Sequence, residues 1–208
     1  MEGLVKSVEF ISAKYDELLI KHQYIEEMST ELVKENQLLK KQVFDLQNQS
    51  EQMCVNFNEL EQYDRWDCLE IQGIPVQEDE DTDALVCSAG NLVNVNIKAE
   101  DISISHHLKS NPTARNQSPA IITKFVRHSM RDKLYHARKY LKEKSTKDVG
   151  LGRISEEKIY IAESLTRKNK ILFNKCLEIK KSLNYKYIWT NQGNIYLRRD
   201  SSSPHLRS

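Results

Sequence analysis

The 208-residue sequence has no long apolar run, few glycines and prolines, and no paired cysteines. No stretch approaches 18 consecutive apolar residues, and residues 1–20 lack the hydrophobic region of a signal peptide. These absences argue against membrane spanning and secretion. The four cysteines, which form no C-x-x-C motif, are Cys54, Cys68, Cys87 and Cys176. We therefore expect free thiols in a reducing compartment, the cytoplasm or the nucleus, rather than disulfides or a zinc site.

Signatures of catalysis are also missing. Gly150 and Gly152 lack the rest of a phosphate-binding loop, and neither G-x-S-x-G nor H-E-x-x-H occurs. His106 and His107 fall in a strand pattern, where adjacent side chains point to opposite faces and cannot share a metal. The acidic run at 78–83 lacks the spacing of a calcium loop. We expect a protein that is not an enzyme and that uses no cofactor or metal.

The N-terminal third carries an uninterrupted seven-residue apolar repeat. No proline precedes Pro75, and Gly3 is the only glycine before Gly73. A strict seven-residue period predicts a left-handed coiled coil over residues 1–64, because it keeps one seam facing a partner helix. The interface residues that the repeat predicts are Leu4, Ile11, Leu18, Ile25, Leu32, Leu39, Leu46, Met53 and Leu60.

The second row of the seam is half polar, and this bears on the number of strands. It contains Val8, Tyr15, His22, Ser29, Asn36, Val43, Ser50 and Phe57. A buried asparagine such as Asn36 can fix register and strand number at a cost in stability. Apolar Val5, Leu19 and Val33 lie beside the first row and widen the seam. We expect a homodimer or homotrimer.

Residues 65–163 alternate strand and helix patterns. Period-two or buried apolar runs predict strands, and apolar positions at helical spacing predict helices. The expected strands are 68–74, 102–108, 120–126 and 158–162, and the expected helices are 81–92 and 129–144. The order β-α-β-β-α-β predicts an α+β fold with a ferredoxin-like sheet, the topology of RNA-recognition domains.

The C-terminal part predicts a small second domain over residues 164–200. Its helix begins at Ser164 or Thr166 and ends near Leu183. Two strands, 185–190 and 195–198, follow and are joined by a tight turn. The serine-rich end, 201–208, predicts a disordered tail.

The formal net charge of +1 conceals two halves of opposite sign. Residues 1–62 carry 6 lysines against 12 acidic residues, a net charge of −6, and residues 63–105 carry a net charge of −8. Residues 106–208 carry 23 basic and 8 acidic residues, a net charge of +15. Such asymmetry points to a polyanion as the partner of the basic half.

The basic half offers cations at spacings that suit a phosphate track. Arg127, Arg131, Arg138 and Lys142 are 4, 7 and 4 residues apart on the expected helix 129–144 and its start, with Tyr135 in the same stripe. Nucleic-acid binding needs such cations along a groove and planar groups for unstacked bases. Further candidates are Arg115, Arg167, Lys168, Arg198 and Arg199.

Aromatic residues of the C-terminal strands allow two interpretations. Tyr185, Tyr187 and Trp189 share one face of a strand by period two. That face could pack on the neighbouring helix or stack on bases. The strands lack the aromatic-rich motif of standard RNA-recognition sheets, so a cleft between the two C-terminal segments is the better candidate site.

Short motifs in the C-terminal two-thirds carry a family resemblance. They are LEIQGIP at 69–75, AIITKF at 120–125, HARK at 136–139, LTRKNKILF at 165–173 and YKYIWTNQGNIYLRR at 185–199. With them the chain resembles the C-terminal domain of baculovirus few-polyhedra (FP) proteins and their insect relatives. It is also similar to the RNA-binding first-open-reading-frame proteins of LINE-type retrotransposons.

The retrotransposon resemblance implies a trimeric coiled coil and two domains that grip single-stranded nucleic acid with chaperone activity. Its basic positions fall on Arg65, Arg115, Lys124 and Arg138, and on Arg167 or Lys168. Glu70 stands where that family tends to have arginine, and Ala114 replaces a basic neighbour of Arg115. Both departures imply weaker binding.

Two functions remain open on the sequence. The first is an oligomeric protein that binds single-stranded RNA or DNA through multivalent phosphate contacts. The second is a coiled-coil structural or adaptor protein, whose basic half docks on an acidic protein or on its own acidic segment at 63–105. Neither involves a membrane.

Overall fold

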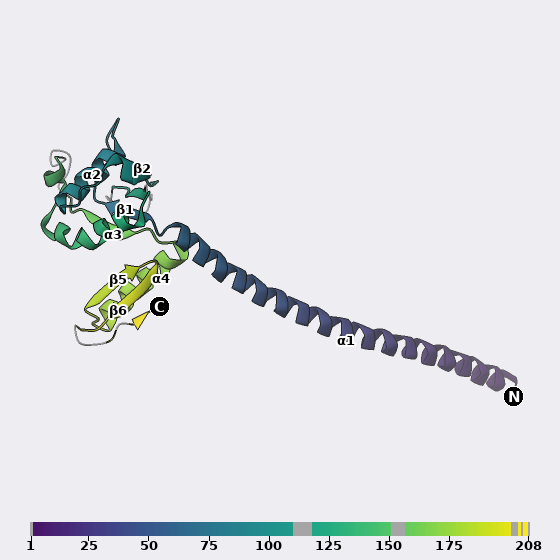
Figure 1. Cartoon of the computed structure of the whole chain (residues 1–208). Coiled ribbons are helices and arrows are strands. Elements are labelled where there is room, and N and C mark those ends of the chain that lie inside the picture. Colours follow the sequence, from purple (N-terminus) through teal and green to yellow (C-terminus); the bar gives the residue numbers. More distant parts are fainter. Residues whose placement is uncertain (1, 110–117, 151–156, 201–203, 205, 208) are drawn as a thin grey trace. The chain divides into compact units, whose positions relative to one another are not determined.

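The computed structural model describes residues 2–109, 118–150, 157–200, 204, 206 and 207. The chain divides into two compact units, Met1–Asn56 and Phe57–Ser208. Helix α1 (Glu2–Asp64) is continuous over its 63 residues (Figure 1). The predicted long N-terminal helix is therefore confirmed, in keeping with the absence of proline and of interior glycine from this segment.

The seven-residue repeat of α1 forms an exposed apolar row. Each of its nine residues, from Leu4 to Leu60, is exposed in the single chain, and so is Asn36. The polar side chains between them form local pairs along the helix, such as Lys14 and Lys21 with Glu17. No residue of Met1–Asn56 has a buried side chain among those described.

A four-stranded antiparallel sheet organises the second unit. Its strands are β1 (Cys68–Gln72), β2 (Ile102–His107), β3 (Ile121–Phe125) and β4 (Tyr160–Glu163), in the order β2-β3-β1-β4. Helices α2 (Thr82–Leu92) and α3 (His128–Ala137) pack with it, around a core that includes Leu69, Ile71, Val86, Phe125 and Leu134. Asp81 caps α2 by accepting from the amides of Asp83 and Ala84.

The helix expected over 129–144 differs in its second half. α3 ends at Ala137, and the chain continues as the 3-10 helix η2 (Arg138–Glu143). The Tyr135 carbonyl accepts from both the backbone amide and the guanidinium of Arg138. A bond to the amide three residues later is typical of a 3-10 helix, whereas an α-helix would use the amide four residues later. Shorter 3-10 helices η1 (Ala99–Asp101) and η3 (Thr146–Val149) lie in the connections.

The C-terminal elements are helix α4 (Arg167–Ser182) and a second sheet. Thr166 caps α4 by accepting from the Asn169 amide. Strands β5 (Tyr187–Asn191) and β6 (Asn194–Arg198) form a hairpin, and β7 (Leu206–Arg207) pairs with β6. Within the predicted tail 201–208, the described residues Leu206 and Arg207 pair with the open edge of β6.

The four cysteines are free thiols in the structure, and two of them are buried. Cys68 and Cys176 are buried, Cys87 is half-buried and Cys54 is exposed on α1. Burial raises the pKa of the Cys68, Cys87 and Cys176 thiols above its ordinary value. Among the described residues, no helix is both long and apolar enough to cross a membrane.

Candidate nucleic-acid interface

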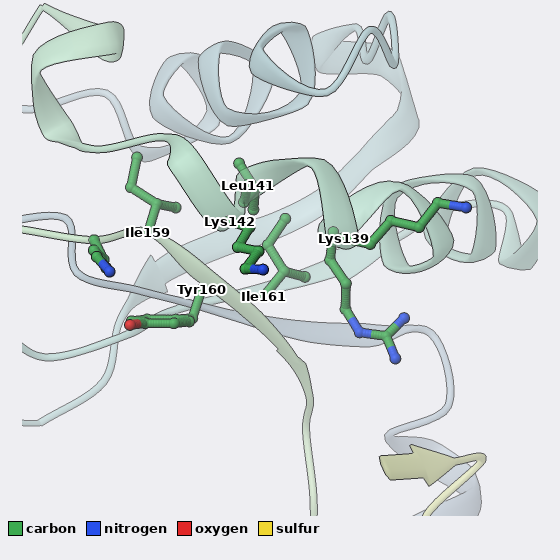
Figure 2. A pocket seen from close by; sticks show the side chains of 8 residues that line it. Lys139, Leu141, Lys142, Ile159, Tyr160 and Ile161 are labelled. Atoms are coloured by element: carbon green, nitrogen blue, oxygen red, sulfur yellow. The ribbon is translucent and has the colours of Figure 1, made fainter. Parts of the chain in front are cut away.

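A basic groove lies between η2 and strand β4. Its volume is about 480 Å³. The residues that line it are Arg138, Lys139, Leu141, Lys142, Lys158, Ile159, Tyr160 and Ile161. Figure 2 shows the helical segment with Lys139, Leu141 and Lys142 beside the strand segment with Ile159, Tyr160 and Ile161, and in that view Lys142 lies between Tyr160 and Lys139.

Side chains alternate in direction along residues 158–161, which places apolar residues at the base of the groove and Lys158 and Tyr160 at its edge. Ile159 and Ile161 are buried in the core with Leu141, whereas Lys158 and Tyr160 point to the other side of the chain and are exposed. Tyr160 is 57% exposed, although its aromatic ring is large. β4 is an edge strand of the sheet, so a ligand can approach along its length.

Arg138 is held in place at the start of η2. Its guanidinium carbon lies 3.6 Å from the centre of the Tyr135 ring, and its Nη1 donates to the Tyr135 carbonyl. Stacking on an aromatic face and a hydrogen bond both reduce the freedom that the side chain would lose on binding. Arg138 is half-buried, so part of the guanidinium still faces solvent.

The groove has a single sign of charge. Four of its eight lining residues are cations, and none is an aspartate or glutamate. The described lining therefore offers several phosphate contacts around one exposed aromatic ring, without a carboxylate to repel the ligand. This combination suits a flexible polyanion with planar groups.

Two residues of the predicted stripe are buried in the structure. Arg131 is 2% exposed and pairs through Nη2 with Glu163, which is equally buried, and through Nη1 with Asp132 at 2.9 Å. Tyr135 is buried, and the guanidinium groups of Arg131 and Arg138 both lie close to its ring. Neither side chain is on the surface that the stripe required, because α3 turns this face towards the sheet.

Glu163 also connects the two sheets of the second unit. Its Oε1 accepts from the Gln192 amide at 2.9 Å, and its Oε2 accepts from the Gly193 amide at 3.2 Å. The hydroxyl of Tyr135 donates to the Thr190 carbonyl at 2.8 Å. Desolvation and the Glu163 carboxylate raise the pKa of Tyr135, which keeps this hydroxyl a donor.

Three other predicted cations are paired with the acidic stretch or the end of α1. Lys124 lies 3.1 Å from Asp64, and this hydrogen bond raises its pKa. Arg127 lies 3.6 Å from Asp101, and Arg65 binds Glu61 and Ser164.

The remaining predicted cations lie apart from the groove lining. Arg167 and Lys168 are exposed in the first turn of α4, whereas Arg198 is at the end of β6 and Arg199 follows it. Arg115 lies outside the described residues. Of the predicted stripe, the groove therefore brings together only Arg138 and Lys142.

Sequence reasoning missed three groove residues, Lys139, Lys158 and Tyr160. Lys139 is next to Arg138, but on a regular helix it would have pointed away from the stripe. Lys158 and Tyr160 reach the groove only because β4 lies beside η2. The alternating pattern at 158–162 could have identified Lys158 and Tyr160 as one outward face.

Gln62, in the last turn of α1, holds the start of α4 and lies against Gly193 of the C-terminal hairpin. It donates to the Ser164 carbonyl and accepts from the Thr166 amide, both at 3.0 Å. Gly193 has φ +78°, and a Cβ there would overlap the Gln62 side chain. We expect Gly193→Ala to lower the free energy of unfolding by about 2 kcal/mol, measured by urea denaturation.

A matched control distinguishes this contact from a general effect of the added methyl group. Gly150 also has a positive φ, +82°, but a Cβ there meets no atom of the described residues within 4 Å. Gly150→Ala should therefore lower the free energy of unfolding only by the cost of placing alanine at a positive φ, and so by less than Gly193→Ala. Equal losses in the two variants would contradict the role assigned to Gln62.

The described residues contain no group of three or more His, Cys, Asp or Glu side chains that could hold a metal ion. His106 is exposed, whereas His107 is half-buried and lies 2.9 Å from Glu80.

One family model matches the chain, and it covers the C-terminal elements. Residues 166–207 match the model described as Baculovirus FP protein domain 2. The matched segment contains α4 and the strands β5, β6 and β7. No curated protein matches the chain.

Proposed function

From the match of residues 166–207 to baculovirus FP protein domain 2, and from the basic groove, we propose that this chain is an oligomeric protein that binds single-stranded nucleic acid. In this proposal it is an FP-like protein of viral or retrotransposon-like origin with an RNA-chaperone-like role. It acts by binding and not by catalysis.

The fold that we propose for the sheet region is ferredoxin-like, as in RNA-recognition domains. The strand order β2-β3-β1-β4 and the antiparallel pairing of all neighbours support it. So does the position of α2 between β1 and β2 and of α3 between β3 and β4. The proposal extends to the retrotransposon proteins, which the motifs of this chain resemble.

The groove between η2 and β4 carries the functional proposal. Cations in a common groove bind phosphates by releasing counterions, and an exposed ring can stack on any unpaired base. Arg138, Lys139, Lys142 and Lys158 provide the cations, and Tyr160 provides the ring. A duplex would offer no unstacked base to Tyr160, so we propose single strands as the ligand.

Oligomerisation through α1 completes the proposal. The exposed seven-residue row is an apolar surface that a second and a third copy of the same helix would bury. Two or three grooves joined by one coiled coil can then bind the same nucleic-acid strand at several points. Individually weak sites then give a high apparent affinity.

Removal of the groove lysines tests the proposal. We expect Lys139→Ala, Lys142→Ala and Lys158→Ala together to weaken binding to a fluorescent single-stranded RNA more than tenfold in low salt. The loss of three phosphate contacts should also reduce the slope of log affinity against log salt by about 2. Fluorescence anisotropy at several salt concentrations measures both effects.

Three lysines of α1 provide a charge-matched control. Lys6, Lys34 and Lys41 are exposed and lie at the repeat position that faces away from the seam. Their replacement by alanine should leave the affinity within about twofold. If wild-type protein of intact oligomeric mass shows no salt-dependent binding, the groove is instead a docking surface for an acidic protein, the alternative left open by the sequence.

A further inference from the structure

The hairpin of β5 and β6 has two different faces. Thr190 pairs with Ile195, and both side chains are buried. The Thr190 Oγ1 lies 3.0 Å from the Tyr135 hydroxyl, so this face is directed towards the rest of the unit. Residues that alternate with Thr190 and Ile195 must lie on the opposite face.

The opposite face carries three aromatic residues, Tyr187, Trp189 and Tyr196, which we call the aromatic face. Trp189 is directly opposite Tyr196 in the register, and their rings are stacked with centres 5.5 Å apart and an angle of 12°. Both are half-buried, and Tyr187 is 39% exposed. Of the two interpretations of Tyr187 and Trp189, packing on the helix or stacking on bases, we develop the second.

The charge around the aromatic face indicates which kind of ligand its exposed part could bind. Residues 185–199 contain three cations, Lys186, Arg198 and Arg199, and no aspartate or glutamate. Arg198 is opposite Tyr187 in the register, and the Lys186 amine lies 5.5 Å from the Tyr187 ring centre. Stacked rings with part of their surface exposed, bordered by cations, suit planar groups attached to phosphates.

We propose that the aromatic face is a second binding site, which takes unpaired nucleobases of a single strand by stacking on Trp189 and Tyr196. This inference rests on the proposed function but uses a surface separate from the groove. None of the residues that line the groove belongs to the hairpin. The groove then binds mainly phosphate, and the aromatic face binds mainly bases.

The two ligand groups can be separated with two probes of equal charge. One is a 20-nucleotide oligouridylate, and the other has the same backbone with abasic sites throughout. In the full chain, Trp189→Ala with Tyr196→Ala should weaken binding of the oligouridylate roughly tenfold or more, with an unchanged salt slope. Binding of the abasic probe should change less than twofold. Trp189→Phe retains a ring and should recover most of the loss.

Tryptophan fluorescence gives an independent measurement that needs no disruptive variant. The chain has two tryptophans, so Trp66→Phe leaves Trp189 as the only one. Oligouridylate should quench its emission, and the abasic probe should not. Salt-dependent binding without quenching, and without loss in the aromatic variants, would overturn the aromatic face alone. Absence of binding by the wild-type chain would overturn the proposed function as well.

Discussion

Replacing Arg131 by methionine is expected to lower the free energy of unfolding by about 3–5 kcal/mol. The substitution leaves Glu163 buried without its cation, and Glu163 also holds the Gln192 and Gly193 amides. An uncompensated buried charge is costly, because little water reaches it. Urea denaturation followed by tryptophan fluorescence at a fixed protein concentration measures the loss.

Arg127→Met is the matched control for this prediction. Arg127 is one helical turn before Arg131, but its side chain is 70% exposed and its partner Asp101 is 3.6 Å away. Asp101 is buried, but it also accepts from the Lys98 amide and its contact with Arg127 is long, so this variant should lose clearly less stability than Arg131→Met. Similar losses in both variants would show that the Arg131–Glu163 pair does not hold the hairpin to the sheet.

The position of Arg131 shows what periodicity can and cannot predict. The spacing of Arg127, Arg131, Arg138 and Lys142 correctly placed these residues on or beside one helical segment. The spacing alone did not predict that Arg131 faces the core. Arg131 does so because it shares the buried side of α3 with Leu134 and Tyr135. The acidic partner, Glu163, is 32 residues away in the sequence and reaches Arg131 only through the sheet.

Patterns with a strong local cause were predicted well. The seven-residue repeat and the missing prolines predicted the helix that ends at Asp64. Alternation or buried apolar runs predicted β1, β2, β3 and β4 within a few residues. These features depend on neighbours along the chain. The groove depends instead on η2 lying beside β4, and the aromatic face depends on which side of the hairpin is buried. Both are tertiary consequences that local patterns do not encode.

The seven-residue row should also determine apparent affinity. We expect Leu32→Asp with Leu39→Asp to convert the proposed oligomer into a monomer, because charges in the seam cannot be buried against a second helix. Both side chains are exposed in the single chain, so the substitutions remove no contact within the second unit. Light scattering measures the mass, and anisotropy measures binding of the single-stranded RNA.

The expected loss of apparent affinity is roughly 100-fold or more, because each groove then binds alone. The salt slope should fall with the number of grooves that contact one strand. Thr30→Asp with Gln37→Asp adds the same charge at positions of the repeat that face away from the seam, and it should retain both mass and affinity. A monomer that binds as tightly as wild type would contradict multivalent binding. The affinity would then come from one groove and one aromatic face.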